Sequence, residues 1–322
     1  NLDISLTNIV LSIWPVYHQY ALKEFEFSIC GDCGCDLPCS QVCDEEYIHF
    51  SEFSVNVNNL NNDINCFNKD DIDVLRDLIS INGLNYLSPL EIGIQAWNMG
   101  RLTTLFINYV QNGTNGINQQ LYNLPDNIGQ LSQLVSLNIQ NNILSNLPNS
   151  FTQLTNLITL TISNNNLVYL PEHFGNLTNL IYLDLAYNEL SSIPESISGL
   201  ENIEHLYLFN NQLVSLPETI CNLNLNWDGI SPTNLPYFAS GGNKFCDTEL
   251  IPYCVKNSAN FNKSFEQFYY TFLVNNPQVC DDLSLFHHDN SPDKYNIHYI
   301  YPNPFNPVTT ISFALPENQN MM

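Results

Sequence analysis

The side chains that could bind a metal ion lie in three short segments of the sequence. The segment 30–43, CGDCGCDLPCSQVC, contains a Cys-x-x-Cys spacing, but it lacks the second pair that a zinc site usually supplies. His287, His288 and Asp289 are consecutive, and neighbouring side chains on an extended chain point apart. The segment 58–71 resembles a calcium-binding loop only faintly, because the central Gly is absent. We therefore expect no metal site.

Patterns that mark catalytic groups are also absent from the sequence. It contains no G-x-S-x-G, no phosphate-binding P-loop and no H-E-x-x-H. We expect a protein that is not an enzyme and has no cofactor. An alternative is a non-catalytic fragment of a larger secreted enzyme.

Charge restricts the partners that this chain can bind. Its 322 residues include 8 Lys and Arg against 32 Asp and Glu, which gives a formal net charge of −24. A chain so acidic repels phosphate backbones and anionic lipid surfaces, so nucleic acid is not an expected partner. No run of 18 apolar residues occurs, so membrane insertion is not expected either.

The cysteines indicate an oxidising compartment. Their even number, and their clustering on both sides of a cysteine-free middle, are typical of disulfides in an exported protein, with reduced cytosolic thiols as the alternative. We expect a small disulfide knot within 1–65, no obvious local partner for Cys66, and a Cys246–Cys254 bond because these two are close in sequence. The ten are Cys30, Cys33, Cys35, Cys39, Cys43, Cys66, Cys221, Cys246, Cys254 and Cys280.

A period of 23 residues organises the middle of the chain. In the unit that begins at Leu180, the alternation of Leu183 and Leu185 predicts a short strand, Asn188 marks a turn, and Pro194 starts the return segment. One such unit buries too little apolar surface to fold alone, so units must stack. The periodic positions are Pro125, Pro148, Pro171, Pro194 and Pro217, together with Asn142, Asn165, Asn188 and Asn211.

These residues resemble the leucine-rich repeat family in its L-x-x-L-x-L-x-x-N-x-L-x-x-L-P form. Four units begin at Leu134, Leu157, Leu180 and Ile203, and a degenerate fifth begins at Leu102, with 110–120 as a protruding loop. The resemblance implies an α/β repeat solenoid: a curved horseshoe with a parallel concave sheet, capped at both ends.

Five segments follow from these patterns. The pattern of residues 68–81 predicts an amphipathic helix, and the segment 94–107 leads into the first strand. Trp97 together with Gly-Arg-Leu at 100–102 resembles the N-terminal cap of extracellular leucine-rich repeat proteins. The segments are 1–65, Cys-rich and of unknown fold; 66–101, an N-terminal cap of helix and strand; 102–224, the repeats; 225–294, a C-terminal cap and linker; and 295–322, a truncated sorting domain.

The segment 301–317, YPNPFNPVTTISFALPE, predicts a Pro-rich entry followed by a strand. It resembles the start of the immunoglobulin-like sorting domain of bacterial type IX secretion cargo. The resemblance implies a bacterial, secreted or cell-surface protein whose tail is recognised by the secretion machinery, and a sequence that is truncated here. An ordinary Pro-rich linker is the alternative.

The outward-facing strand positions indicate where a ligand binds. Those of the middle coils are small and polar, whereas those of the last two coils are mostly aromatic, and exposed aromatic side chains on a rigid sheet are typical of interfaces. We expect an exported, non-catalytic protein that binds a protein or glycan ligand on its concave face, with a structural or adhesive spacer as the alternative. The expected binding residues are Tyr182, Asp184, Tyr187, His205, Tyr207 and Phe209.

Overall fold

The computed structural model describes the cap, the repeats and two short C-terminal strands. The described residues are 43–52, 54–59, 65–84, 87–109, 117, 119–231, 235–267, 273–280, 296–301 and 310–314. Cys30 to Cys39, His287 to Asp289 and most of the 110–120 loop therefore lie outside the described residues. The chain forms two units, Asn1–Cys280 and Asp281–Met322.

The N-terminal cap is built around the predicted helix, α3 (Lys69–Ile81). Asn68 caps it by accepting a hydrogen bond from the Asp71 backbone nitrogen at 3.2 Å. Its apolar face is buried, as the periodicity predicts. The described helices are all too short or too polar to cross a lipid bilayer. The cap strands are β1 (Tyr47–His49), β2 (Val57–Asn59) and β3 (Cys66–Asn68), with β1 antiparallel to β3.

A buried ion pair fastens this helix to the first coil. Asp71 is fully buried and accepts two hydrogen bonds from the Arg101 guanidinium, both at 2.9 Å. The same carboxylate accepts a third bond from the Leu102 backbone nitrogen at 2.9 Å. A carboxylate with this many donors offsets its own desolvation, so it fixes the helix against the strand rather than destabilising it.

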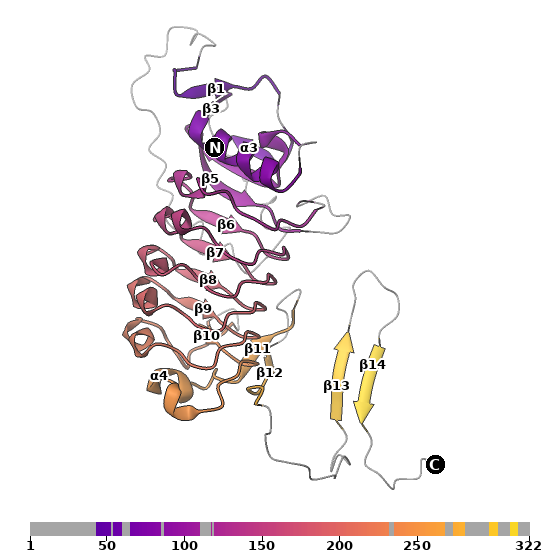
Figure 1. Ribbon diagram of the computed structural model, residues 1–322, viewed down its shortest axis with the longest axis vertical. Helices are drawn as coiled ribbons and strands as arrows, with labels where there is room; N and C mark the ends of the chain where they lie inside the picture. The colour runs from indigo at the N-terminus through magenta and orange to yellow at the C-terminus, as the bar shows by residue number, and fades with distance from the viewer. Residues whose placement is uncertain are drawn as a thin grey trace, which may run out of the picture. The chain divides into compact units, whose positions relative to one another are not determined.

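The repeats form one continuous sheet of consecutive parallel strands (Figure 1). Strand β4 (Ile94–Asn98) is antiparallel to β5 (Arg101–Phe106), and from β5 onward each strand pairs in parallel with the next. The fold is the predicted repeat solenoid. The later strands are β6 (Ser136–Asn138), β7 (Thr159–Thr161), β8 (Tyr182–Asp184), β9 (His205–Tyr207) and β10 (Phe238–Ala239).

Short 3-10 helices form the return side of each coil. Phe151 and Phe174 in two neighbouring turns are buried and stack with ring centres 6.4 Å apart, so the return side also contributes to the core. The turns of the coils are η2 (Ile128–Gln130), η3 (Asn149–Gln153), η4 (Phe174–Asn176), η5 (Glu195–Gly199) and η6 (Glu218–Asn222). The caps contain η1 (Pro89–Glu91), η7 (Thr248–Leu250) and α4 (Tyr253–Lys256).

The periodic asparagines form a buried ladder that links successive coils. The Asn165 Oδ1 accepts a bond from Leu144 N at 3.0 Å in the preceding coil. Its Nδ2 donates to Ile139 O and Ile162 O, both at 3.0 Å. Asn142, Asn188 and Asn211 make the same set of bonds to their own neighbours. Each of these side chains bonds backbone groups of its own turn and of the preceding coil, and so joins two coils.

The ladder continues one coil beyond residue 224, into the segment assigned to the C-terminal cap. Asn243 Oδ1 accepts from Leu213 N at 3.1 Å, and its Nδ2 donates to Leu208 O at 2.9 Å. Asn243 lies 32 residues after Asn211 rather than 23, so the period does not reveal it.

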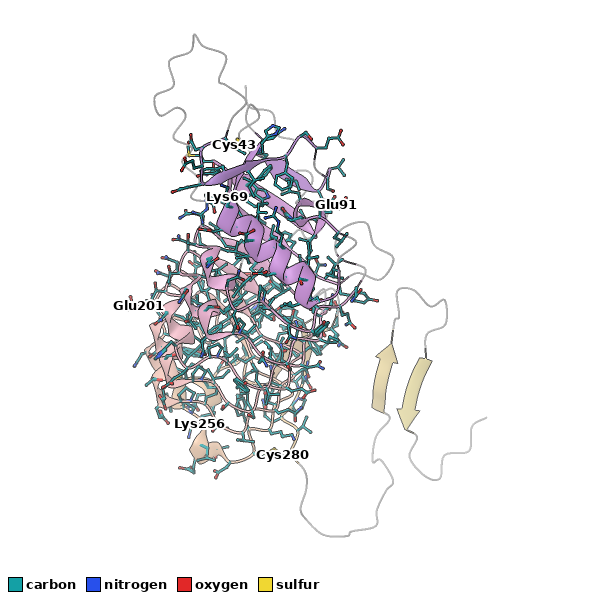
Figure 2. All side chains as sticks on the ribbon, turned by 45° about the horizontal axis from the view of Figure 1, so that its top comes forward. Cys43, Lys69, Glu91, Glu201, Lys256 and Cys280 are labelled. Atoms are coloured by element: carbon teal, nitrogen blue, oxygen red, sulfur yellow. A yellow bond between two sulfur atoms is a disulfide. The ribbon has the colours of Figure 1, made fainter. Side chains whose placement is uncertain are left out.

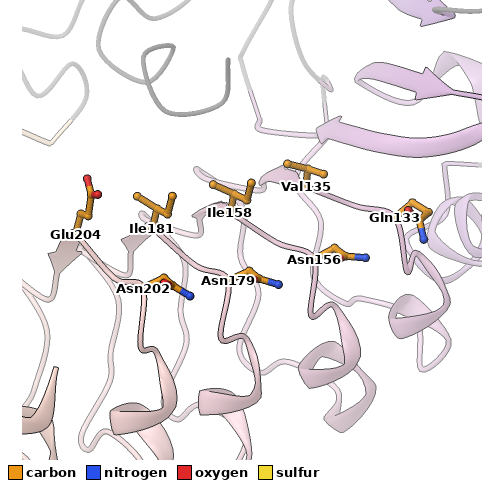
Figure 3. A pocket seen from close by; sticks show the side chains of 8 residues that line it. All are labelled: Gln133, Val135, Asn156, Ile158, Asn179, Ile181, Asn202 and Glu204. Atoms are coloured by element: carbon orange, nitrogen blue, oxygen red, sulfur yellow. The ribbon is translucent and has the colours of Figure 1, made fainter. Parts of the chain in front are cut away.

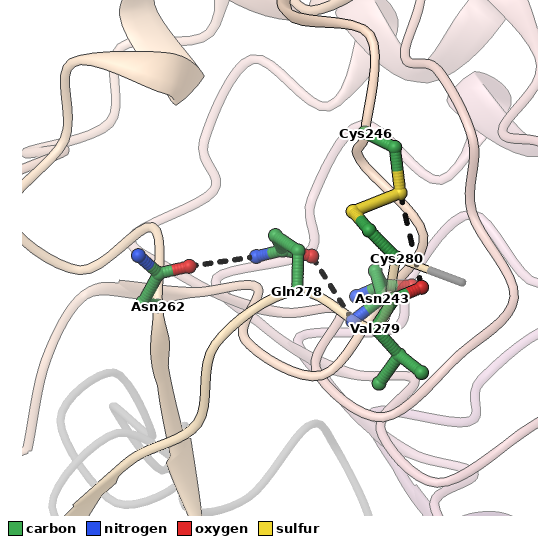
Figure 4. Close-up of a disulfide and its surroundings, with 6 residues drawn as sticks. All are labelled: Asn243, Cys246, Asn262, Gln278, Val279 and Cys280. Carbon is green, nitrogen blue, oxygen red and sulfur yellow. Dashed lines mark hydrogen bonds between the residues drawn. A yellow bond between two sulfur atoms is a disulfide. The ribbon is translucent and has the colours of Figure 1, made fainter. Parts of the chain in front are cut away.

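Three disulfides join described cysteines, and each of them corrects a sequence expectation. Cys66 pairs with Cys43, and Cys246 pairs with Cys280 rather than with Cys254, which pairs with Cys221. Proximity in sequence failed because the C-terminal cap folds back over the last coil. Cys43 and Cys280 lie at opposite ends of the first unit (Figure 2). Beside Cys280, Gln278 accepts from Asn243 N at 3.0 Å and donates to Asn262 (Figure 4).

The second unit contains an antiparallel pair of strands, β13 (Asn296–Tyr301) and β14 (Thr310–Ala314). β14 falls within the strand that the sequence predicts after the Pro-rich entry. The entry itself, 302–309, lies outside the described residues.

Replacing Asn165 with Ala should lower the free energy of unfolding by about 1–3 kcal/mol, because it leaves buried backbone groups without partners. Chemical denaturation measures this loss. The neighbouring Asn166, whose side chain is exposed, provides the control: Asn166→Ala should change stability by less than about 0.5 kcal/mol. Equal stability of the two variants would contradict the ladder.

Peptide mapping of the unreduced protein should recover three linked pairs: Cys43–Cys66, Cys221–Cys254 and Cys246–Cys280. At most four of the ten cysteines should then react with a thiol reagent after denaturation without reductant, since six are paired. A Cys246–Cys254 peptide, or ten reactive thiols, would contradict the fold of the C-terminal cap.

Candidate functional site

The concave sheet places the outward-facing residues in the predicted rows. Strand pairing aligns Thr104, Ser136, Thr159, Tyr182 and His205 in one row. The next row, two residues further along each strand, is aligned in the same way from Phe106 to Tyr207. From Ser136 to His205 these registers follow directly from the 23-residue period, whereas Thr104 lies 32 residues before Ser136. An insertion or deletion of one residue within a strand would turn its side chains to the other face.

The predicted aromatic residues form a cluster on the last coils. The aromatic cluster comprises Tyr182, Tyr187, His205, Tyr207 and Phe209. The ring centres of Tyr182 and Tyr207 are 5.5 Å apart, as are those of Tyr187 and Phe209. Such edge-to-face distances are those of packed aromatic pairs.

The expectation that these side chains are exposed is wrong. Tyr182 is 3% exposed, Tyr207 and His205 are 1% exposed, and Phe209 and Asp184 are fully buried. Tyr187 alone among the predicted residues is half-buried. Asp184 Oδ1 accepts from Ala186 N at 3.0 Å, so this carboxylate has a structural role beside the cluster.

A hairpin from the C-terminal cap covers the aromatic cluster. The C-terminal hairpin consists of β11 (Lys263–Phe265) and β12 (Leu273–Asn275), which pair antiparallel. The Phe265 ring is buried, with its centre 5.5 Å from that of Tyr207 and 5.9 Å from that of Phe209. The sequence gives no signal of this contact, because its partners lie far apart and outside the repeat period.

One row of residues on the coils holds the hairpin segment in place. Asn164, Tyr187 and Asn210 each have a positive φ, between 53° and 54°, which turns the backbone just before the ladder asparagine. The Tyr187 hydroxyl donates to Phe265 O at 2.7 Å. Asn164 exchanges hydrogen bonds with Gln267, and Asn210 accepts from Asn276 at 2.8 Å. Burial raises the pKa of Tyr187, so its hydroxyl remains a donor.

His205 is kept neutral beneath this cover. Its Nδ1 lies 3.3 Å from Pro236 O, and Tyr207 donates to the same carbonyl at 3.0 Å. Desolvation lowers the pKa of His205 to about 4, although the Pro236 carbonyl favours the protonated ring. A buried neutral histidine among tyrosine rings stabilises the fold and is poorly placed to bind a charged ligand.

The accessible part of the concave face lies at its other end. On the first two coils, Thr104, Phe106, Tyr109, Asn138 and Asn141 are half-buried rather than buried. None of these side chains is charged, so the accessible face can offer hydrogen bonds and apolar contact. In the described part of the chain, no group of three or more His, Cys, Asp and Glu side chains could hold a metal ion.

Comparison with known families identifies the repeats. Two family models of the leucine-rich repeat match, one over residues 168–213 and one over residues 156–177. These matches identify residues 156–213 as leucine-rich repeats, and the parallel sheet of consecutive strands is the solenoid fold that such repeats form. No curated protein matches it.

Solved structures that this chain resembles include plant proteins and a protein of Leptospira interrogans. A plant ice-binding protein is 20% identical, with a TM-score of 0.42, and the match covers 55% of this chain and 64% of the ice-binding protein. The leucine-rich repeat ectodomain of the receptor kinase SOBIR1 from Arabidopsis thaliana is 24% identical, covers 58% and 96%, and has a TM-score of 0.43. A leucine-rich repeat protein of Leptospira interrogans is 29% identical, covers 46% and 50%, and has a TM-score of 0.29. The chain therefore spans less than two thirds of the ice-binding and Leptospira proteins.

Stability should depend on pH through His205. Its pKa of about 4 in the folded state lies below the ordinary 6.5, so the unfolded state binds the proton more readily. The contribution of this group is complete above pH 6.5 and decreases as pH falls toward 4, by a total of about 3 kcal/mol. Denaturation of the parent and of His205→Gln across this range measures it. The parent should lose more stability than the variant between pH 6.5 and 4; parallel curves would contradict a neutral buried His205.

Proposed function

We propose that this chain is an exported, non-catalytic binding protein that recognises a protein or glycan through the concave face of its leucine-rich repeats. The observation that carries the proposal is the uncharged, half-buried surface on the first coils, set on a sheet with fixed register. A rigid sheet loses little conformational entropy on binding, and so a modest contact area is enough for specific recognition.

The ligand contacts that we propose are Phe106, Tyr109 and Asn138, with Thr104 and Asn141 beside them. Phe106 and Asn138 are direct neighbours across β5 and β6. An aromatic ring next to an amide can pack on an apolar group of the ligand and hydrogen-bond an adjacent polar group. This is the combination that interface hot spots and sugar sites both use.

The six binding residues predicted from the sequence lie on the last coils, at the other end of the concave face from the proposed ligand contacts. Tyr187 is the one with an accessible surface, and it lies between the open coils and the C-terminal hairpin. Tyr182, Asp184, His205, Tyr207 and Phe209 would then act by shaping and stiffening that end, since they are buried.

Disulfides support the export part of the proposal. All six cysteines in the described part of the chain are paired, and disulfides form and persist in oxidising compartments. The route of export stays a prediction: the likeness of 301–317 to the sorting domain of bacterial type IX cargo motivates it, and a strand at 310–314 is compatible with it.

Replacing Phe106 and Asn138 together with Ala should lower binding to the chain's ligands at least about tenfold, because both contacts are lost. Purified chain probed against a glycan array and an array of extended peptides would provide the ligands and the measurement. Tyr169→Ala with Asn146→Ala is the matched control, since both side chains are exposed outside the concave rows. Equal binding by both variants would contradict the proposed face. An absence of ligands on either array would favour the structural spacer instead.

A further inference from the structure

A second surface, beside the concave sheet, carries two regular rows of side chains. It is a groove of about 550 Å³ that runs across four coils just before their strands. We call it the edge groove. Figure 3 shows the two rows lying parallel, with one pair of side chains from each coil. The pairs are Gln133 and Val135, Asn156 and Ile158, Asn179 and Ile181, and Asn202 and Glu204.

Backbone hydrogen bonds fix the spacing of the row formed by Val135, Ile158, Ile181 and Glu204. Ile158 N donates to Val135 O at 2.8 Å, Ile181 N to Ile158 O at 2.9 Å, and Glu204 N to Ile181 O at 2.8 Å. These residues are therefore direct neighbours across the sheet, and parallel strands lie about 4.8 Å apart. The three aliphatic side chains are half-buried, so they present a continuous apolar strip.

The amide row is held in a defined orientation. Asn156, Asn179 and Asn202 each donate from Nδ2 to a carbonyl of the preceding coil, at 2.7, 2.8 and 2.8 Å. All three side chains are exposed. One hydrogen bond per amide fixes the side chain, while its second N–H and its carbonyl oxygen remain available on the groove side. The row is thus a preorganised set of donors and acceptors.

A groove with this chemistry suits a neutral ligand. The chain carries a net charge of −24, and Glu204 adds a carboxylate to one end of the groove, so an anionic polymer would be repelled. Hydroxyl groups pair well with amides and with a carboxylate, and the apolar faces of sugar rings pack on aliphatic side chains. An extended peptide has a different repeat, about 3.3 Å per residue, so its residues cannot match consecutive coils one to one.

We propose that the edge groove binds a linear, neutral, β-1,4-linked polysaccharide, with one sugar on each coil. The spacing of the coils is close to the advance per sugar in such an extended chain. Three rings would lie over Val135, Ile158 and Ile181, and the fourth would lie beside Glu204. Successive rings of such a chain are inverted, so hydroxyl groups from alternate edges of the rings would reach the amides of successive coils. The groove is separate from the ligand contacts proposed on the concave face, so either site can exist without the other.

The number of coils provides a sharp test with defined oligosaccharides. Calorimetric titration of the full chain with β-1,4-linked glucose oligomers of two to six sugars should show affinity rising to the tetramer, because four coils line the groove. The gain from dimer to tetramer should be at least about tenfold, and that from tetramer to hexamer less than about threefold. The N-acetylglucosamine series should follow the same pattern. The α-1,4-linked glucose tetramer, which coils, should bind at least about tenfold more weakly.

Matched variants assign the binding to the groove. Asn156→Ala with Asn179→Ala should weaken tetramer binding at least about tenfold, and Asn146→Ala with Asn166→Ala, two exposed asparagines of the same repeats outside the groove, should leave it within about twofold. Ile158→Ala with Ile181→Ala keeps the amide bonds and should also weaken binding, which covers the case in which loss of those bonds affects folding. The Phe106→Ala, Asn138→Ala variant should bind the tetramer normally. Failure of every β-1,4 series to bind, affinity that keeps rising beyond four sugars, or full binding by both groove variants would overturn the proposal.

Discussion

A buried amide that must satisfy two coils at once is the constraint on which this structure depends. Each ladder asparagine is at most 5% exposed, and its side chain replaces the backbone bonds that the turn cannot make. Because Asn165 reaches both Leu144 N and Ile139 O, a coil cannot shift along its neighbour without breaking buried hydrogen bonds. The register of the whole sheet follows from this requirement.

A fixed register gives the molecule two surfaces from the same period. Side chains within the strands form the concave rows, and side chains just before the strands form the edge groove. Both rows repeat at the strand spacing, and both are rigid since their backbones are hydrogen-bonded to the next coil. Binding of the proposed ligands on either surface would therefore require little reorganisation of the protein.

The features that could be predicted from the sequence are those set by local patterns or by the 23-residue period. The helix at 69–81, the strand register and the asparagine ladder all follow from local patterns or from the 23-residue spacing. The contact of the C-terminal hairpin with the aromatic cluster could not be predicted, because Phe265 and Tyr207 are far apart in the sequence and lie outside the period. The ladder role of Asn243 and the Cys246–Cys280 disulfide were not predicted for the same reason. The edge groove was not predicted for a different reason. Asn and Ile are ordinary residues in these repeats, and they form a surface only because they are aligned across successive coils.

The ends of a solenoid explain why the aromatic residues are where they are. The C-terminal cap folds back over the concave side of the last coils, so these coils need apolar groups that a cap of different structure can pack against. Tyr207 and Phe209 supply these groups, and the C-terminal hairpin supplies Phe265 in return. Aromatic enrichment at the end of a repeat array thus has two causes, recognition and capping, and sequence alone does not separate them. Here the ring contacts favour capping, and for this reason we place the proposed recognition on the polar coils and on the groove beside them.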